Sequence, residues 1–138
     1  MNPRISDWQG KRVWLMGASS GIGEALARKL AAAGADVALS ARRAERMADL
    51  AQGMPNALVL PCDATDAAAL DAARERIVAS WGGVDLAVYL AGDYVPMRAE
   101  GFDLAVAEKV IEVNFNGALR LAVTVLPDLA PGGGIAFV

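Results

Sequence analysis

The stretch WLMGASSGIGEALARKL, from Trp14 to Leu30, joins an apolar run to a helical pattern through a turn that holds three glycines and two serines. Val13–Met16 is short and continuously apolar, which is typical of a buried strand. Ile22–Ala33 is rich in helix-forming residues, and Gly34 follows it as a residue suited to ending a helix. The stretch therefore predicts a strand, a glycine-rich turn and a helix, in that order.

The same alternation continues along the rest of the chain. Further strands are expected at Val37–Ala41, Ala57–Leu60 and Asp85–Ala91, with a fifth beginning at Ile135–Val138. Helices are expected at Ala44–Met54, Asp66–Trp81 and Phe102–Leu126, the last in one piece or two, and Thr65 is the expected N-cap of the second. Because strands separated by helices pair in parallel through right-handed crossovers, the sequence predicts a doubly wound α/β sheet with the strand order 3-2-1-4-5.

Length and composition argue against several classes of protein. The 138 residues fit one domain, taken here as 1–138. No apolar run approaches the roughly 18 residues of a bilayer span and no signal-peptide pattern is present, so we expect no membrane partner. The net charge of −3, without a basic tract, argues against nucleic acid. A single cysteine, Cys62, and the absence of histidine fit a cytoplasmic protein without a disulfide, a metal site of the usual zinc kind or a histidine base.

The glycine-rich turn has the properties that a phosphate group requires. In the pattern G-x-x-x-G-x-G, one glycine permits a positive φ, another leaves the backbone open to a diphosphate, and a third lets helix and strand pack closely. The helix N-terminus adds N–H donors, and the serine hydroxyls can add more. The residues expected to line this site are Gly17, Ser19, Ser20, Gly21, Ile22 and Gly23. A glycine-rich turn without a ligand is the alternative, since a glycine pattern alone is a weak signal.

Further motifs follow in register with this turn. SARR comes after the second strand, CDATD after the third, YLAG at the end of the fourth, NFNG in the long helix and GGGIAFV at the fifth strand. With GASSGIG, these segments resemble the short-chain dehydrogenase/reductase family over essentially the whole chain. The glycine spacing is similar to that of its oxidoreductase branch and differs from that of the extended, epimerase-like branch. The resemblance implies a Rossmann-like fold and hydride transfer between a nicotinamide cofactor and a carbonyl or alcohol substrate.

The residues after the second strand bear on which nicotinamide cofactor is bound. In NAD enzymes of this fold an acidic residue about 20 positions beyond the glycines binds the ribose hydroxyls. Here that position corresponds to Ala41, and Arg42 and Arg43 follow it. Asp36 begins the strand and lies at the wrong end of the sheet. A guanidinium without a carboxylate favours the 2′-phosphate of NADP over NAD, with Arg42 as its first contact and Arg43 as a second. Two solvated surface arginines are the alternative.

The resemblance assigns four more residues to the cofactor. Asp63 is expected to accept a hydrogen bond from the adenine amino group, and Ala64 to contribute its backbone. Ala91 and Gly92 end the fourth strand, where small residues let the ribose and diphosphate lie against the main chain. A capping or turn role is the alternative for Asp63, and an ordinary turn is the alternative for Gly92.

The long helix carries one expected catalytic residue and one expected interface. Asn114 matches the asparagine of the family's catalytic tetrad, which positions a water in a proton relay; an asparagine that bonds the backbone at a kink is the alternative. The helix Asn114–Leu126 is apolar on more than one side. In the family the corresponding helix packs on the sheet and against a second copy, so we expect a homo-oligomer.

The remaining catalytic groups of the family are absent. The family's chemistry needs a serine and a Tyr-x-x-x-Lys pair, but the residues four positions beyond Tyr89 and Tyr94 are Asp93 and Arg98. In the family these groups come after the fifth strand. We therefore expect the chain to be the N-terminal, cofactor-binding part of a longer enzyme and inactive alone. The alternatives are a dinucleotide-binding or sensing module without catalysis and a structural interaction fragment.

Two positions depart from the family pattern. Met16 stands where the family usually has a threonine before the first glycine, and one hydroxyl contact in the turn is lost. YLAG replaces the usual N-N-A-G, so that Tyr89 and Leu90 stand where asparagine amides normally join the fourth strand to its neighbours. These changes bear on the local hydrogen bonding more than on the fold.

Overall fold

Five parallel strands form the sheet of the computed structural model, which describes residues 5–138. They lie in the order β3-β2-β1-β4-β5, so the predicted doubly wound topology is confirmed. The strands are β1 (Arg12–Met16), β2 (Asp36–Ser40), β3 (Leu58–Val59), β4 (Val84–Tyr89) and β5 (Leu129–Phe137). The order of the strands reverses between β1 and β4, which is where ligands bind in sheets of this kind.

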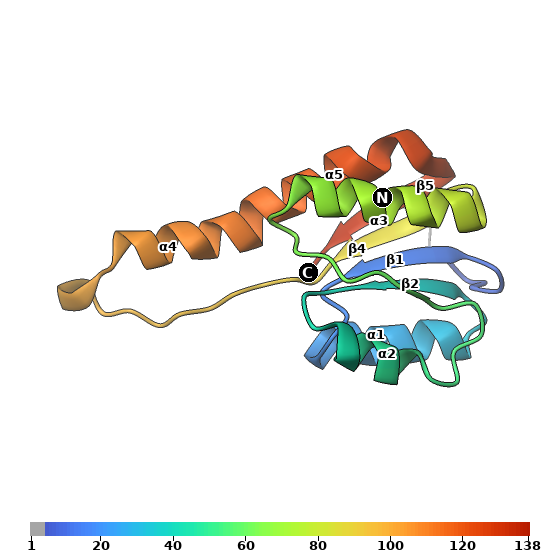
Figure 1. Cartoon of the computed structure of the whole chain (residues 1–138), viewed down its shortest axis with the longest axis horizontal. Helices are drawn as coiled ribbons and strands as arrows, with labels where there is room; N and C mark the ends of the chain where they lie inside the picture. Colours follow the sequence, from blue (N-terminus) through green and yellow to red (C-terminus); the bar gives the residue numbers. More distant parts are fainter. Residues whose placement is uncertain (1–4) are drawn as a thin grey trace.

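The helices cover both faces of the sheet. One face carries α1 (Gly21–Ala32) and α2 (Ala44–Ala51), and the other carries α3 (Ala67–Trp81) and α5 (Gly117–Val125) (Figure 1). Between β4 and α5 the chain forms a short 3₁₀ turn, η1 (Ala99–Gly101), then α4 (Leu104–Ile111) and a π-helical turn, η2 (Glu112–Asn116). A last 3₁₀ turn, η3 (Leu126–Asp128), leads into β5. Figure 1 shows α4 extending away from the layered body.

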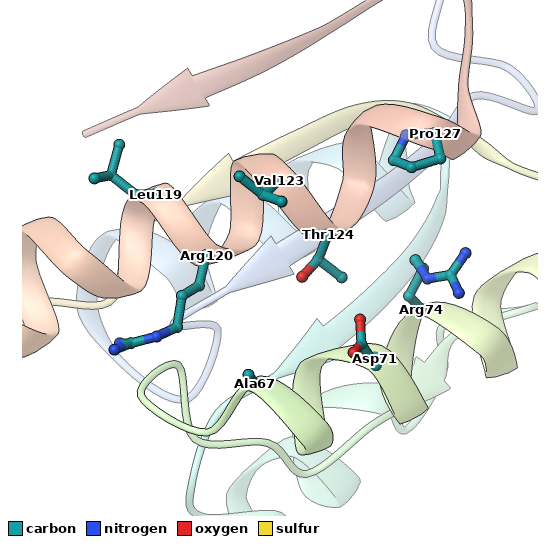
Figure 2. Close-up of a pocket in the computed structure, with 8 residues that line it drawn as sticks. All are labelled: Ala67, Asp71, Arg74, Leu119, Arg120, Val123, Thr124 and Pro127. Carbon is teal, nitrogen blue, oxygen red and sulfur yellow. The ribbon is translucent and has the colours of Figure 1, made fainter.

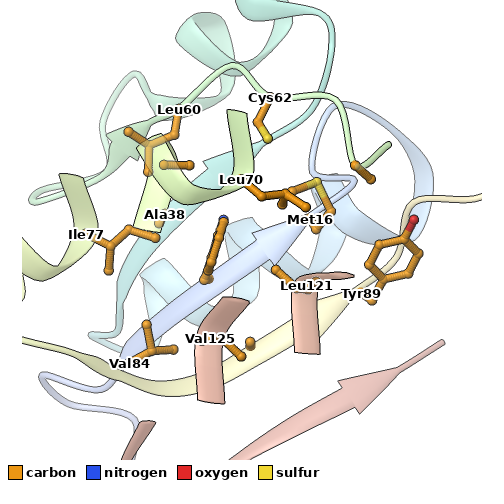
Figure 3. Close-up of a cluster of buried hydrophobic side chains, with 14 of the residues drawn as sticks. Met16, Ala38, Leu60, Cys62, Leu70, Ile77, Val84, Tyr89, Leu121 and Val125 are labelled. Carbon is orange, nitrogen blue, oxygen red and sulfur yellow. The ribbon is translucent and has the colours of Figure 1, made fainter. Parts of the chain in front are cut away.

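Side chains of β1 alternate between two buried layers, because successive residues of a strand point to opposite faces. Trp14 and Met16 pack with residues of α3 and α5, as Figure 3 shows for Met16 beside Leu70 and Leu121. Val13 and Leu15 pack with residues of α1 and α2 on the other face. A run that is apolar at every position is therefore what a central strand of a covered sheet requires.

The last helix and the last strand differ from the sequence prediction. The helix expected at Phe102–Leu126 forms two pieces, as the sequence allowed, but α4 begins only at Leu104 and a π-helical turn separates it from α5. β5 begins at Leu129 instead of Ile135, because the proline and glycine run within it is accommodated as an irregularity of the strand. A Cβ at Gly133 would lie 2.9 Å from the carbonyl oxygen of Asp85, so the two backbones approach too closely there for a side chain.

The predicted cap of α3 was also wrong by one residue. Asp66 is the N-cap, and its side chain accepts a hydrogen bond of 3.1 Å from the backbone N–H of Ala69. The hydroxyl and the backbone N–H of Thr65 instead donate to Asp63. α2 ends at Ala51, three residues earlier than expected. Of the helices in residues 5–138, none combines the length and the apolar character that crossing a bilayer requires.

Hydrogen bonds from the Arg12 side chain connect β1 to β4 at the end of the sheet opposite the glycine-rich turn. The Arg12 side chain donates to both carboxylate oxygens of Asp85, at 2.8 and 3.2 Å, and to the Trp81 carbonyl at 3.0 Å. We expect Arg12→Met to lower the free energy of unfolding by about 1–3 kcal/mol at pH 7, because partly buried charge-assisted hydrogen bonds contribute on that order. Urea unfolding measures the change. The exposed Arg28–Glu24 pair is the matched control, and Arg28→Met should cost about 0.5 kcal/mol or less.

The contact between Arg12 and Asp85 also makes the stability of the fold depend on pH. The side-chain hydrogen bonds from Arg12, with a further one from its backbone N–H, lower the pKa of Asp85. Because the folded-state pKa lies below the unfolded value of about 3.9, the contribution is complete above that value and is lost as the pH falls through the folded-state pKa. The stability difference between the unsubstituted chain and Arg12→Met should therefore shrink below about pH 4. A difference that stayed constant throughout acid titration would contradict this role for Asp85.

Candidate functional site

The glycine-rich turn is held by the strands on both sides of β1. The backbone N–H groups of Gly17 and Ala18 donate to the Ser40 carbonyl at the end of β2, at 2.7 and 3.2 Å. The Leu90 N–H, just after β4, donates to the Met16 carbonyl at 2.7 Å. The turn therefore lies at the carboxyl ends of three adjacent strands, where the order of the sheet reverses.

Each glycine of the turn has a separate structural reason. Gly17 has φ +102°, and a Cβ there would lie 2.5 Å from the backbone N of Ala91, two residues after the end of β4. Gly23 is buried, and a Cβ on it would collide with the Gly17 carbonyl oxygen and lie 3.1 Å from the Ala18 Cα. Gly21 has φ +57° and nothing within 4 Å of where its Cβ would be. Gly21 is thus the glycine whose bare backbone faces open space, and Gly23 is the glycine that lets the helix pack on the turn.

The start of α1 presents its backbone to solvent. Ser20 is the N-cap in extended conformation, and its hydroxyl makes no capping hydrogen bond. The hydroxyls of Ser19 and Ser20 each accept a hydrogen bond of 3.2 Å from Arg43 Nη2, and Ile22 is exposed. The arginine predicted as the second phosphate contact therefore already lies against the turn, so that the positive end of the helix dipole and a guanidinium face the same region.

Arg42 and Asp63 lie on the same side of the site. Asp63 Oδ1 accepts hydrogen bonds from the Thr65 N–H and hydroxyl, at 2.9 and 2.8 Å. These bonds, the backbone one first, lower the pKa of Asp63, and the nearby charge of Arg42 lowers it further. The carboxylate is therefore ionised at neutral pH and available as an acceptor. Ala64 is buried beside it, and Asp36 lies at the opposite end of β2, where it accepts from Asn56.

Asn114 lies in the π-helical turn and faces the residue after YLAG. Its Oδ1 accepts from the Asp93 N–H at 2.7 Å, and its Nδ2 donates to the Asp93 carbonyl at 2.9 Å. A Cβ at Gly92 would lie 3.7 Å from the same Oδ1. The backbone hydrogen bonds that the alternative interpretation of Asn114 required are therefore present, within a π-helical turn, and they hold this asparagine just after β4.

The structure brings the predicted site residues to one end of the sheet. The turn, the arginines after β2, the aspartate after β3 and the small residues after β4 all follow carboxyl strand ends. Three contacts of the site could not be predicted from the sequence. The Ser40 carbonyl and the Asp93 backbone are main-chain groups, which any residue type would supply. The Tyr89 hydroxyl, which donates a hydrogen bond to the π-helical turn, was visible in the sequence only as a departure from the family pattern.

The described residues support neither a metal site nor a reactive cysteine. Within residues 5–138 no group of three acidic, cysteine or histidine side chains is placed to hold a metal ion. Burial, with the charges of Asp63 and Asp66 adding to it, raises the pKa of Cys62 to about 11, so its thiol is neutral at physiological pH and a poor nucleophile.

A separate hollow lies on the helical face, away from the strand ends. It has a volume of about 510 Å³ and lies between α3 and α5 (Figure 2). Its lining consists of Ala67, Asp71, Arg74, Leu119, Arg120, Val123, Thr124 and Pro127. Figure 2 shows Leu119 and Val123 on α5 and the charged Asp71 and Arg74 on α3. The hollow is thus largely apolar with a charged border, and none of the predicted cofactor residues lines it.

A parallel sheet of this order with a glycine-rich turn at its switch point defines a Rossmann-like protein. A sequence profile of the short chain dehydrogenase family matches residues 11–138. Among curated proteins, the fatty acyl-CoA reductase of Acinetobacter baylyi is 38% identical over an alignment of 127 residues that covers 88% of this chain and 43% of that protein. The chain belongs to the short-chain dehydrogenase/reductase family.

Solved structures agree with this assignment. A short-chain dehydrogenase/reductase from Serratia marcescens is similar with a TM-score of 0.88 and 30% identity, over 94% of this chain and 55% of that one. A short chain dehydrogenase from Burkholderia cenocepacia, solved in complex with NADP, is similar with a TM-score of 0.88 and 31% identity, over 96% of this chain and 56% of that one. The chain therefore spans about half the length of these relatives.

Proposed function

We propose that this chain is the cofactor-binding part of an NADP(H)-dependent oxidoreductase. The observation that carries the proposal is the arrangement at the carboxyl strand ends: open backbone at Gly21, the N-terminus of α1, and two arginines directly after β2. A diphosphate fits bare N–H donors at a helix N-terminus. The additional phosphate of NADP fits a guanidinium that has no competing carboxylate at the ribose position.

The proposed reaction is hydride transfer between the nicotinamide and a carbonyl or alcohol carbon. When bound, the nicotinamide supplies the hydride chemistry. The residues of this chain bind and orient the cofactor: the turn Gly17–Gly23 holds the diphosphate, and Asp63 accepts from the adenine amino group. Asn114 holds a water for proton transfer at the end of β4. A part of the protein outside this chain would supply the serine, tyrosine and lysine of the reaction. The chain alone should therefore not convert a carbonyl or alcohol substrate.

Adenosine fragments test the proposed site without the nicotinamide half. We expect 2′,5′-ADP to bind the chain at least about tenfold more tightly than 5′-AMP, since one charge-assisted hydrogen bond to a phosphate contributes roughly 1.5–3 kcal/mol. Calorimetric titration at fixed salt measures both affinities. Equal affinities would remove the argument for NADP, and no binding of either nucleotide would support the structural interaction fragment, the one alternative that needs no nucleotide site.

We also propose that a second copy of the chain covers the outer face of the α4–α5 segment. The side chains of Ile111, Phe115, Leu119, Val123 and Leu126 are each more than half exposed there. They follow one another at helical spacing, and Leu119 and Val123 also line the hollow between α3 and α5. An exposed apolar stripe of this kind is typical of an interaction surface. In the family the corresponding helix packs against a second copy of the protein, which is the partner proposed here.

A charge within the stripe tests the pairing. Val123→Glu is expected to weaken self-association by about tenfold or more, because it places an unpaired carboxylate in the buried centre of the contact. Analytical ultracentrifugation over a concentration series measures the effect. Ile22→Glu is the matched control, since Ile22 is equally apolar and exposed but lies on α1, on the other face of the sheet. A monomer at all concentrations before substitution would contradict the proposal.

A further inference from the structure

The π-helical turn changes the hydrogen bonding of the helix directly before Asn114. The Gly117 N–H donates to the Glu112 carbonyl, five residues earlier in the chain. In an α-helix the same N–H would donate to the Val113 carbonyl, four residues earlier. The turn therefore releases the Val113 carbonyl from Gly117, and the Tyr89 hydroxyl donates a hydrogen bond to it.

The surroundings of Tyr89 are adapted to this contact. Tyr89 is the last residue of β4 and is 2% exposed. It lies at the edge of the buried cluster between the sheet and α3 and α5 (Figure 3). A Cβ at Gly117 would collide with the Tyr89 hydroxyl. Gly117 is the only glycine of α5, so this helix lacks a side chain at the one position where the phenol ring needs room.

The contact lies one residue from Asn114. A π-turn inserts one residue into a helix, which changes the direction of the neighbouring side chains by about 100° relative to an uninterrupted α-helix. In the observed register both polar atoms of the Asn114 side chain bond the Asp93 backbone. The direction of Asn114 therefore depends on the register that the π-turn sets.

We propose that Tyr89 is a positioning residue, whose hydroxyl stabilises the π-turn register that directs Asn114 to the end of β4. The inference rests on the proposed function, since Asn114 has its catalytic role only there. A carbonyl that is partly shielded from water, as at Val113, is unfavourable when it has no hydrogen-bond partner. Without the phenol hydroxyl, the Gly117 N–H regains the Val113 carbonyl, the π-turn relaxes toward α-helix, and Asn114 turns away from Asp93.

Tyr89→Phe tests the proposal directly, because it removes the hydroxyl and keeps the ring. In ¹⁵N-labelled chain we expect the side-chain amide signals of Asn114 to move to the values of a free asparagine. We also expect hydrogen exchange of the Asp93 amide to quicken by about tenfold or more, as for the loss of one hydrogen bond. Tyr94→Phe is the matched control, since Tyr94 is 83% exposed. Asn114 and Asp93 signals that stay in place in Tyr89→Phe would overturn the proposal.

A second pair of variants tests the contact by melting temperature. Gly117→Ala alone should lower Tm, because the added methyl group collides with the Tyr89 hydroxyl. In the Tyr89→Phe background the collision with the hydroxyl is absent, and the Cβ then meets only the Cβ and the carbonyl oxygen of Ala64, each at 3.3 Å. The same substitution should therefore lower Tm less in that background, where the helical preference of alanine over glycine also offsets part of the crowding. Equal shifts in both backgrounds would contradict the contact. Neither measurement uses a cofactor, so a failure of the proposed function, seen in nucleotide titrations, is separate from a failure here.

Discussion

Gly23→Val is expected to lower the affinity of the chain for NADPH by about 100-fold or more, which corresponds to roughly 2.7 kcal/mol. The sequence alone attributes such a loss to blocked approach of the diphosphate. The structure gives a different reason: a side chain at Gly23 would collide with the Gly17 carbonyl oxygen and crowd Ala18, so the turn itself must open. Opening the turn displaces the backbone N–H groups that the diphosphate would bind.

Fluorescence titration with NADPH measures the effect, with circular dichroism to establish that the variant is folded. Gly101→Val is the matched control. Gly101 also lacks positive φ, a Cβ there has nothing within 4 Å, and it lies in the turn before α4. Its affinity for NADPH should stay within about twofold of the unsubstituted chain, because the added side chain meets no part of the turn. A folded Gly23→Val chain with unaltered affinity would contradict the assignment of the turn.

Arg42→Ala is expected to weaken NADPH binding by about 10- to 100-fold and to leave NADH binding within about twofold, because only NADPH carries the 2′-phosphate. Arg42 is exposed directly after β2, and its charge acts on Asp63 across the site. Arg43, which bonds the serines of the turn, is expected to contribute less to the difference between the two cofactors.

Arg76→Ala provides the control for net charge. It removes the same charge from an exposed position on α3, on the other face of the sheet, and should change the affinity for neither cofactor by more than about twofold. Equal losses for NADPH and NADH in Arg42→Ala would mean that Arg42 does not contact the 2′-phosphate. Arg42 would then affect the binding of both cofactors equally, through its contribution to the electrostatic potential of the site.

The strand order and the position of the turn could be predicted from the sequence because they depend on local patterns. A run such as Val13–Met16, apolar at every position, is typical of a strand covered on both faces, and both layers of the core confirm the strand. The arginines after β2 and the aspartate after β3 were placed correctly at one edge of the sheet, since all parallel strands end there. Their contacts with a cofactor stay predictions.

Features that depend on contacts between distant residues could not be predicted. The π-helical turn requires the Tyr89 hydroxyl at the Val113 carbonyl, 24 residues away in the chain. The early start of β5 requires β4 as a partner for a segment whose glycines favour a loop when it is considered alone. The cap of α3 passed from Thr65 to Asp66 because Asp63 already bonds the threonine hydroxyl.

The central claim is that the turn between β1 and α1 and the arginines after β2 form a site for NADP(H). Calorimetric titration of the unsubstituted chain with NADPH and with NADH, at one salt concentration, tests it most directly. The account predicts saturable binding of one NADPH per chain, at least about tenfold tighter than NADH. Absence of binding, or NADH binding as tightly as NADPH, would contradict it.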